Sequence, residues 1–186
     1  GARLTARKKM GISSEKMILL SVGVLSQRKN PRFLVDSLNP LLDKINAICV
    51  FLGDGKERAW CEAHRTDRMI FVGNTKDVCL YLSAADLFLS SSRSEGLPNS
   101  VLEALEAGVP VLLSDIEPHK EIVGLDGSVG DLFRLDDKKD FSEKLVRLHE
   151  NIDLSWGLRA RKLVEHHFSA VNMSKEYQRL YIEMVQ

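Results

Sequence analysis

The chain has 186 residues, and its 26 lysine and arginine residues balance 26 aspartate and glutamate residues, so the formal net charge is zero. This length fits one α/β domain, and the balanced charge argues against a dedicated nucleic-acid-binding protein, which normally carries a basic excess. Apolar residues make up 44% of the sequence and charged residues 28%, which is typical of a globular domain and argues against a disordered tail or a membrane protein.

Short apolar runs alternate along the chain with segments of helical periodicity. In the first half, the expected elements in chain order are a helix over 4–11 ended by Gly11, a strand over 17–22, a helix over 32–44, a strand over 47–52, a polar helix carrying Trp60, a strand over 69–72 and a helix over 77–83. In the second half, they are a strand over 87–89, a helix over 98–107, a strand over 109–113, a helix over 117–123, a strand over 131–135, and closing helices over 141–151, 156–167 and 169–186.

This alternation predicts an α/β fold. Five or six short apolar strands separated by helices indicate parallel pairing with right-handed crossovers. Several of the apolar runs are continuous, as is typical of strands that helices cover on both faces. We therefore expect a doubly wound, Rossmann-like parallel sheet of about six strands. Ligands of such sheets bind beyond the carboxyl ends of the strands, so the residues that follow each strand are the candidates for function.

Glycine follows three of the first four expected strands, at Gly23, Gly53 and Gly73, and Gly96 lies soon after the fourth. One such glycine is an ordinary turn signal, but the series favours a ligand that approaches the backbone at this edge of the sheet. The sequence contains neither Gly-x-Gly-x-x-Gly nor Gly-x-x-x-x-Gly-Lys-Ser/Thr. This disfavours a nicotinamide dehydrogenase and excludes a P-loop enzyme.

The most informative segment runs from residue 94 to residue 108. Pro98 is expected to open a helix, whose free backbone N–H groups and positive dipole end suit a diphosphate. Glu95 precedes this helix, and Glu103 lies within it, where its carboxylate can accept two hydroxyl donors from one edge of a sugar. Alone, Glu103 would be interpreted as a solvated helix residue and Glu95 as a loop residue, but the two together, in register with Gly96 and Pro98, favour a binding site.

The segment Glu95-Gly-Leu-Pro98, followed by Leu102-Glu103-Ala104, resembles the motif of two glutamates with seven residues between them in retaining glycosyltransferases of the GT-B fold. It is similar to glycosyltransferase family 4 (group 1) in particular. The resemblance extends from about Met17 to Val123. It is carried further by an ordered series of short pieces, which are Val22-Gly23 with Lys29-Asn30, Phe51 to Gly55, Phe71 to Gly73, Ala84 to Asp86, and Gly108 to Val111.

The resemblance implies a diphosphate site in the loop that contains Gly23. Lys29 would pair with the donor diphosphate as a point charge. Many family members carry an arginine directly after the loop glycine, where this chain has Val24. Either Arg28 supplies a second cation or the site has only one.

The other implied roles concern the sugar and the nucleoside. Glu95 would face the donor sugar near its reacting carbon, and Glu103 would hold the ribose hydroxyls. Gly96, Leu97 and Pro98 would present backbone groups to the phosphate and the sugar. The residues expected near the base are Gly73, Asn74 and Thr75.

In the implied reaction, the nucleoside diphosphate leaves the sugar and an acceptor hydroxyl adds with retention of configuration. The implied catalytic residues are Glu95 and Lys29, with the leaving charge stabilised by Lys29 and the helix N-terminus. We expect no cofactor and no metal, because the nucleotide sugar is a substrate and strand ends carry no Asp-x-Asp. Asp136-Asp137 lies in a late polar loop.

Several other polar residues receive structural interpretations. We expect His119 to be a solvated loop residue, and His166-His167 to end a helix. The sequence has three cysteines, an odd number, and no Cys-x-x-Cys pair. This predicts buried, reduced thiols at Cys49, Cys61 and Cys79. A basic group near the start of the chain is expected to form a solvated face, and its members are Arg3, Arg7, Lys8 and Lys9.

The resemblance also divides the chain. Residues 1–12 would be a linker or short helix from a first domain, residues 13–168 the nucleotide-sugar-binding domain, and residues 169–186 a C-terminal helix. That helix carries an apolar stripe including Tyr177 and Leu180, which either caps this domain's own core or packs on the first domain. We expect this half of an enzyme to bind nucleotide weakly and to be inactive alone.

The implied function is transfer of a sugar in bacterial-type polysaccharide or glycolipid synthesis. The implied partners are a UDP- or GDP-sugar, the acceptor-binding first domain, and a glycan or lipid-linked acceptor, with no nucleic acid. The expected location is the cytoplasm, with any contact at the inner face of the membrane made by the first domain. The alternative is a non-catalytic nucleotide-sugar-binding module of the same fold. A hydrolase that uses Glu95 and Glu103 as acid and base is disfavoured by their spacing across a helix start.

Overall fold

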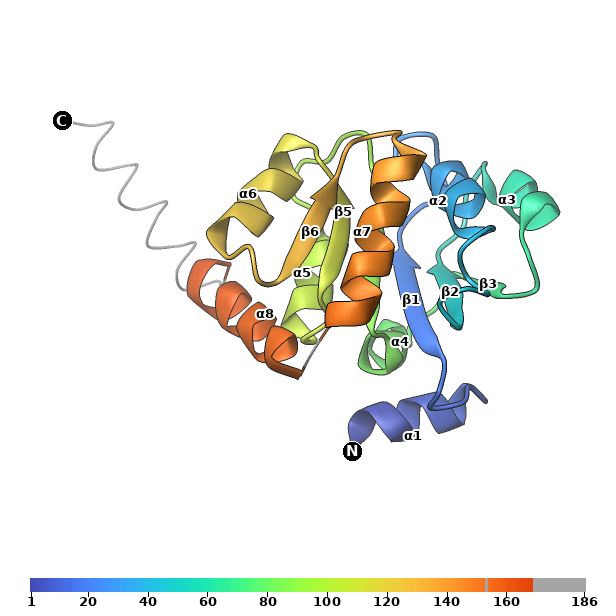
Figure 1. The fold of residues 1–186 in the computed structure, drawn as a ribbon. Helices are drawn as coiled ribbons and strands as arrows, with labels where there is room; N and C mark the ends of the chain where they lie inside the picture. Colours follow the sequence, from blue (N-terminus) through green and yellow to red (C-terminus); the bar gives the residue numbers. More distant parts are fainter. Residues whose placement is uncertain (153, 169–186) are drawn as a thin grey trace.

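The structure is a computed structural model and describes residues 1–152 and 154–168. In this part of the chain, six parallel strands form one sheet in the order β3-β2-β1-β4-β5-β6 (Figure 1). The strands are β1 (Met17–Val22), β2 (Ala47–Leu52), β3 (Met69–Gly73), β4 (Leu87–Ser90), β5 (Val111–Ser114) and β6 (Gly130–Phe133). The helices are α1 (Ala2–Lys9), α2 (Pro31–Leu38), α3 (Arg58–His64), α4 (Val78–Ala84), α5 (Asn99–Glu106), α6 (Glu117–Leu125), α7 (Lys138–Asn151) and α8 (Leu154–His167).

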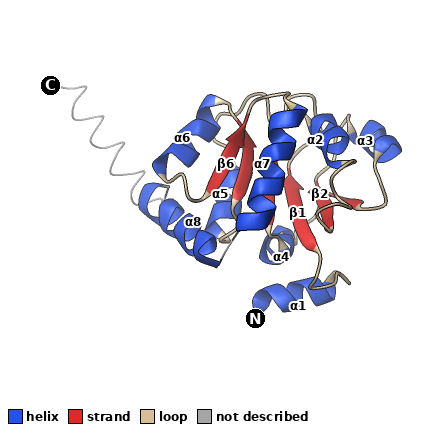
Figure 2. Ribbon diagram, viewed as in Figure 1, coloured by secondary structure: helices blue, strands red, loops and turns tan. Residues whose placement is uncertain are grey.

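Helices cover both faces of the sheet, as the secondary-structure colouring shows (Figure 2). Successive strand residues point to opposite faces, so Leu19 and Phe51 join a core with α2, α3 and α7, whereas Leu20 and Val50 join a core with α1, α4, α5, α6 and α8. All six residues of β2 are buried, because helices cover this strand on both sides. The predicted doubly wound parallel sheet is confirmed.

Three phenylalanines join the last strand to the first helix after β1. The rings of Phe33 in α2 and Phe133 in β6 stack with their centroids 5.4 Å apart. Phe141 of α7 meets both rings edge-on, at centroid distances of 5.6 Å and 5.0 Å. This aromatic contact places the segment after β6 beside the segment before α2.

Proline explains three boundaries that differ from the predicted ones. The helix expected over 32–44 ends at Leu38, because Pro40 lacks the N–H group that would continue it. Pro98 is not the first helical residue but the cap before it, since its ψ of 71° is not helical. The strand expected to begin at Val109 begins at Val111, after Pro110. The helix expected over 169–186, with its apolar stripe, lies outside the described residues.

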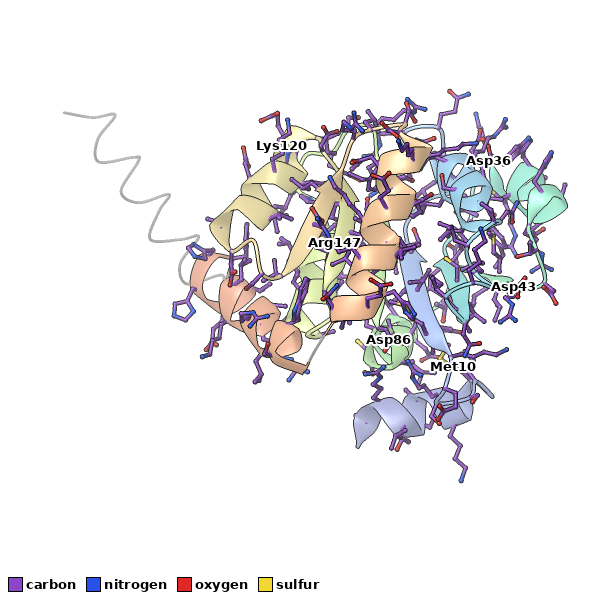
Figure 3. The ribbon with its side chains drawn as sticks, viewed as in Figure 1. Met10, Asp36, Asp43, Asp86, Lys120 and Arg147 are labelled. Atoms are coloured by element: carbon purple, nitrogen blue, oxygen red, sulfur yellow. The ribbon has the colours of Figure 1, made fainter. Side chains whose placement is uncertain are left out.

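The N-terminal basic group is only partly solvated, which corrects the prediction for Arg7. The Arg7 side chain is 3% exposed and forms an ion pair with Asp86. Its guanidinium also donates to the carbonyl oxygens of Ala84 at 3.1 Å, Ser14 at 3.1 Å and Lys16 at 2.9 Å. This buried arginine fixes α1 to the amino ends of the strands. Its partner Asp86 lies at the opposite end of the sheet from Lys120 (Figure 3).

The cysteines are also only partly as predicted. Cys49 and Cys61 are buried free thiols, and burial raises the pKa of both, that of Cys61 to about 11. Cys79, in the first turn of α4, is exposed, so the prediction that it is buried is wrong. Its apolar neighbours in the sequence misled the interpretation, because the side chains at successive helical positions point in different directions.

The strand order reverses direction between β1 and β4, and this reversal is the switch point where doubly wound sheets bind ligands. The turns after β1 and β2 approach each other closely there. Gly53 has a φ of 120°, and a Cβ atom on it would lie 2.1 Å from the carbonyl oxygen of Gly23. A side chain at Gly53 would therefore displace the backbone of the β1 turn.

We expect Gly53→Ala to destabilise the fold by more than about 2 kcal/mol, since strain at such a backbone conformation alone costs about 1–3 kcal/mol. Chemical denaturation measures the change. The matched control is Gly124→Ala in α6, where a Cβ would meet nothing within 4 Å; it should stabilise by about 0.5–1 kcal/mol. A Gly53→Ala variant as stable as the unaltered chain would contradict the close approach of the two turns.

Candidate functional site

Glu95 lies at the centre of a cluster formed by the segments that follow β1 and β4. Its side chain is 5% exposed, and its carboxylate accepts three hydrogen bonds. Lys29 Nζ donates to Oε1 at 2.5 Å, and Ser92 Oγ donates to the same oxygen at 2.6 Å. Arg28 donates to Oε2 at 2.7 Å. We call Arg28, Lys29, Ser92 and Glu95 the Glu95 cluster.

The Glu95 carboxylate is held in its charged form. Burial raises the pKa of Glu95, but hydrogen bonds from Lys29, Ser92 and Arg28, together with the charge of Lys29, outweigh this effect and bring the pKa below its ordinary value. The cluster therefore contains two cations and one anion at neutral pH.

The cation-bearing loop before α2 is fixed from two sides. Asn30 is 7% exposed and left-handed, with a φ of 55°, and its amide donates to Asp136 Oδ1 at 3.0 Å. Asp136 also accepts two hydrogen bonds from the Arg93 guanidinium, at 2.5 Å and 2.9 Å. The Arg93 backbone N–H donates to the Arg28 carbonyl at 2.8 Å. We call Asn30, Arg93 and Asp136 the clamp.

The sequence did not predict the clamp, and Asp136 was expected only to belong to a late polar loop. Asp136 and Arg93 are 43 positions apart, and no spacing rule connects them. Ser92 could have been found, because it lies in the serine run directly after β4 and thus at the carboxyl edge of the sheet.

His119 is buried, so the prediction of a solvated loop histidine is wrong. It lies in the first turn of α6 with no exposed surface, and its Nδ1 is 2.9 Å from the Ser114 carbonyl oxygen. Because a carbonyl oxygen only accepts, Nδ1 carries the proton and Nε2 is an acceptor in the neutral ring. Nε2 is buried without a hydrogen-bond partner. Ser114 Oγ in turn donates to the Ser92 carbonyl at 2.6 Å, which connects His119 to the Glu95 cluster.

Gly23 lies against Lys29 of the Glu95 cluster, and residues 96–98 follow Glu95 directly in the sequence. A Cβ on Gly23 would lie 3.4 Å from Lys29 Cε, so the lysine stem crosses over this glycine. Gly96 and Leu97 are exposed, whereas Pro98 is buried. Val24 is 58% exposed and brings no charge, whereas Arg28 contacts Glu95.

The other predicted residues lie apart from this cluster. Glu103 is exposed on α5 and lines a cavity of about 680 Å³ between α5 and α8, together with Asn99 and Arg161. Gly73 ends β3, at the far edge of the sheet, and pairs with Gly53. Asn74 is exposed, and the Thr75 hydroxyl accepts from the Asp77 N–H at 3.1 Å. A ligand that contacts both the Glu95 cluster and residues 73–75 would have to extend along the carboxyl edge of the sheet, whereas Glu103 faces the cavity beside α8.

The described residues, 1–152 and 154–168, contain neither a candidate metal site nor a candidate membrane span. No group of three or more histidine, cysteine, aspartate or glutamate side chains has the arrangement of a metal site. None of the described helices combines the length and apolarity needed to cross a bilayer.

The sequence family described as "Glycosyl transferases group 1" matches residues 16–151, which include the Glu95 cluster and the clamp. The chain belongs to the group 1 glycosyl transferases. It is 25% identical over 188 residues to N-acetyl-alpha-D-glucosaminyl L-malate synthase of Bacillus anthracis, covering 96% of this chain and 49% of that protein. It is 26% identical over 188 residues to the UDP-Gal:alpha-D-GlcNAc-diphosphoundecaprenol alpha-1,3-galactosyltransferase of Escherichia coli, covering 96% of this chain and 48% of that protein. This group 1 chain thus spans about half the length of these curated relatives.

Solved structures share the fold of this group 1 chain. WaaG, a glycosyltransferase involved in lipopolysaccharide biosynthesis, has a TM-score of 0.78 at 25% identity, covering 89% of this chain and 47% of that one. Anabaena Alr3699/HepE in complex with UDP and glucose has a TM-score of 0.83 at 18% identity, covering 97% and 51%. The C-terminal domain of a group 1 family protein (LpcC) from Francisella tularensis has a TM-score of 0.74 at 18% identity, covering 90% and 93%. The described sheet therefore has the Rossmann-like architecture of GT-B glycosyltransferases.

The burial of His119 predicts a loss of stability in acid. Burial lowers the pKa of His119, and Lys29 lowers it further, against the opposing effects of the Ser114 hydrogen bond and the Glu95 charge. The unfolded chain, with a histidine pKa of about 6.5, then binds a proton before the folded chain does. Stability is therefore retained above about pH 6.5 and lost as the pH falls below it.

We expect the melting temperature of the unaltered chain to fall between pH 7.5 and pH 5.5 by more than that of His119→Gln, which does not titrate at this position. Calorimetric melting of both proteins across this range measures the difference. Equal pH dependence of the two melting temperatures would contradict a neutral buried imidazole.

Proposed function

We propose that this chain is the donor-binding half of a family 4 retaining glycosyltransferase, which transfers a sugar from a nucleotide diphosphate to an acceptor. The observation that supports it most is the position of the Glu95 cluster. Two cations and a buried carboxylate converge at the switch point of the sheet, close in sequence to the start of α5. Such a group suits a ligand with an anionic part and a part rich in hydroxyl groups.

The chemistry follows from the charges. As the bond between the sugar and the diphosphate breaks, negative charge grows on the leaving phosphate. Lys29, Arg28 and the positive dipole end of α5 would stabilise this charge, and preorganised charges of this kind supply a large share of catalysis. Glu95 would accept hydrogen bonds from the sugar near its reacting carbon. The acceptor oxygen then forms the new bond to that carbon, and configuration is retained.

The remaining residues would contact the other parts of the nucleotide sugar. Glu103 would hold the ribose hydroxyls, and Gly96, Leu97 and Pro98 would present backbone groups to the phosphate and sugar. The base would lie toward β3, near Gly73, Asn74 and Thr75. We propose that neither a metal nor a cofactor takes part, because two side-chain cations and a helix N-terminus can balance a diphosphate.

Known proteins of this fold support the proposal that this chain is the C-terminal, donor-binding half of the enzyme. The Alr3699/HepE complex contains UDP and glucose, and the E. coli relative is named for a UDP-galactose donor and a lipid-linked acceptor. The Francisella domain that this chain covers almost entirely is a C-terminal one. We therefore propose a preceding acceptor-binding domain, which residues 1–12 would join to this one, a glycan or lipid-linked acceptor, and a role in polysaccharide or glycolipid synthesis on the cytoplasmic side of the membrane.

We expect UDP or GDP to bind the chain, and both Lys29→Ala and Glu103→Ala to weaken binding about tenfold or more. Each removes a hydrogen bond to a charged group, which contributes about 1.5–3 kcal/mol. Isothermal titration calorimetry with both nucleotides measures the affinities. Lys138→Ala is the control, because Lys138 pairs with Asp36 at 2.9 Å, in a contact between α2 and α7.

The outcomes separate the parts of the proposal. Equal affinity of Lys29→Ala and the unaltered chain would contradict the diphosphate site. Equal affinity of Glu103→Ala would contradict only the ribose contact. Binding of nucleotide sugars by the full-length protein without transfer to any acceptor would favour a non-catalytic module of the same fold.

A further inference from the structure

Glu95 contacts the same two cations that the proposed function assigns to the diphosphate. We propose that the Glu95 carboxylate competes with a diphosphate for Arg28 and Lys29, so that the site favours a nucleotide that carries a sugar over the bare nucleoside diphosphate. This inference rests on the proposed function and adds a selectivity to it.

The competition follows from the contacts of the cluster. Lys29 Nζ and the Arg28 guanidinium lie 2.5 Å and 2.7 Å from the two oxygens of Glu95. A third cation, Arg93 in the loop after β4, donates to both carboxylate oxygens of Asp136 and not to Glu95. The two cations and Glu95 thus present one net positive charge to a diphosphate, and a neutral residue at position 95 would leave two.

Burial decides which partner bears the cost when a diphosphate binds. The Arg28 side chain is 52% exposed and the Lys29 side chain 20% exposed, so both can reorient toward a phosphate. The Glu95 side chain is only 5% exposed and cannot turn to water. If the cations move, Glu95 keeps the Ser92 hydroxyl but loses its charged donors, and a buried carboxylate without its partners is costly.

A sugar on the diphosphate removes this cost. Its hydroxyl groups can donate to the Glu95 carboxylate in place of the two cations, which are then free to hold the phosphates. A bare nucleoside diphosphate has no hydroxyl group at that place and leaves the Glu95 carboxylate with the Ser92 hydroxyl as its remaining donor. The site would therefore bind the donor better than the product that remains after transfer, and Glu95 would promote release of that product.

The decisive variant is Glu95→Gln, which removes the charge and keeps the shape and an oxygen acceptor. We expect it to bind bare UDP or GDP about tenfold more tightly than the unaltered chain at low salt, a change of about 1.4 kcal/mol. We expect a smaller gain, or a loss, for UDP-glucose and GDP-mannose. Because the diphosphate would bind in part through the exposed Arg28 side chain, the gain for the bare nucleotides should shrink at 0.5 M salt, where screening acts over about 4 Å.

Two controls accompany the titrations. Glu150→Gln removes the same charge from an exposed residue near the end of α7 and should change none of the affinities. Thermal unfolding of each variant establishes that the affinities are compared between folded proteins.

Each result has one meaning. Tighter binding of bare UDP or GDP by Glu95→Gln, without a matching gain for the nucleotide sugars, supports the competition. Weaker or unchanged binding of the bare nucleotides would show that Glu95 mainly positions Lys29, and would overturn the inference while the proposed function stands. Failure of the unaltered chain to bind any of the four nucleotides would overturn the proposed function and the inference with it.

Discussion

The reversal of strand order between β1 and β4 is the constraint on which the rest of the structure depends. Because helices leave these two strands toward opposite faces of the sheet, their following loops diverge around a shared space. One loop brings Arg28 and Lys29, and the other brings Ser92 and Glu95. Opposite charges from distant parts of the sequence meet there at hydrogen-bond distance.

The fold could be predicted from the sequence because its strands are short, continuous apolar runs. The bounds of β1 and β2 agree with the predicted ones, because a polar residue precedes each apolar run and a glycine follows it. The ends of helices were less predictable. Helical apolar spacing continues past Pro40, although the backbone cannot continue the helix there. Arg7 was misjudged because its partners Ala84 and Asp86 are far away in the sequence. His119 was misjudged although its partner Ser114 is only five positions away, because hydropathy does not show that the ring turns back to the Ser114 carbonyl.

The candidate site could be predicted in part. The glutamates and Lys29 were found through a motif, and the structure places Glu95 and Lys29 in contact. The structure adds what holds them. Asp136, which follows β6, accepts a hydrogen bond from Asn30, and the Ser114 hydroxyl at the end of β5 donates to the Ser92 carbonyl. Sequence spacing predicts neither contact. The group 1 family match covers all of these residues.

The bond between Asn30 and Asp136 connects residues 106 positions apart, and this separation has a consequence for synthesis of the protein. Domains begin to fold from the N-terminus as the ribosome extends the chain. Strands β1 to β3 and the loop with Lys29 are made early, but the clamp closes only after β6 and Asp136 have emerged. Contacts of such long range form slowly, because a large loop must close first. In an incomplete chain, Arg28 and Lys29 are therefore present before Asp136 can fix their loop, and a fully ordered Glu95 cluster marks a domain whose last strand is in place.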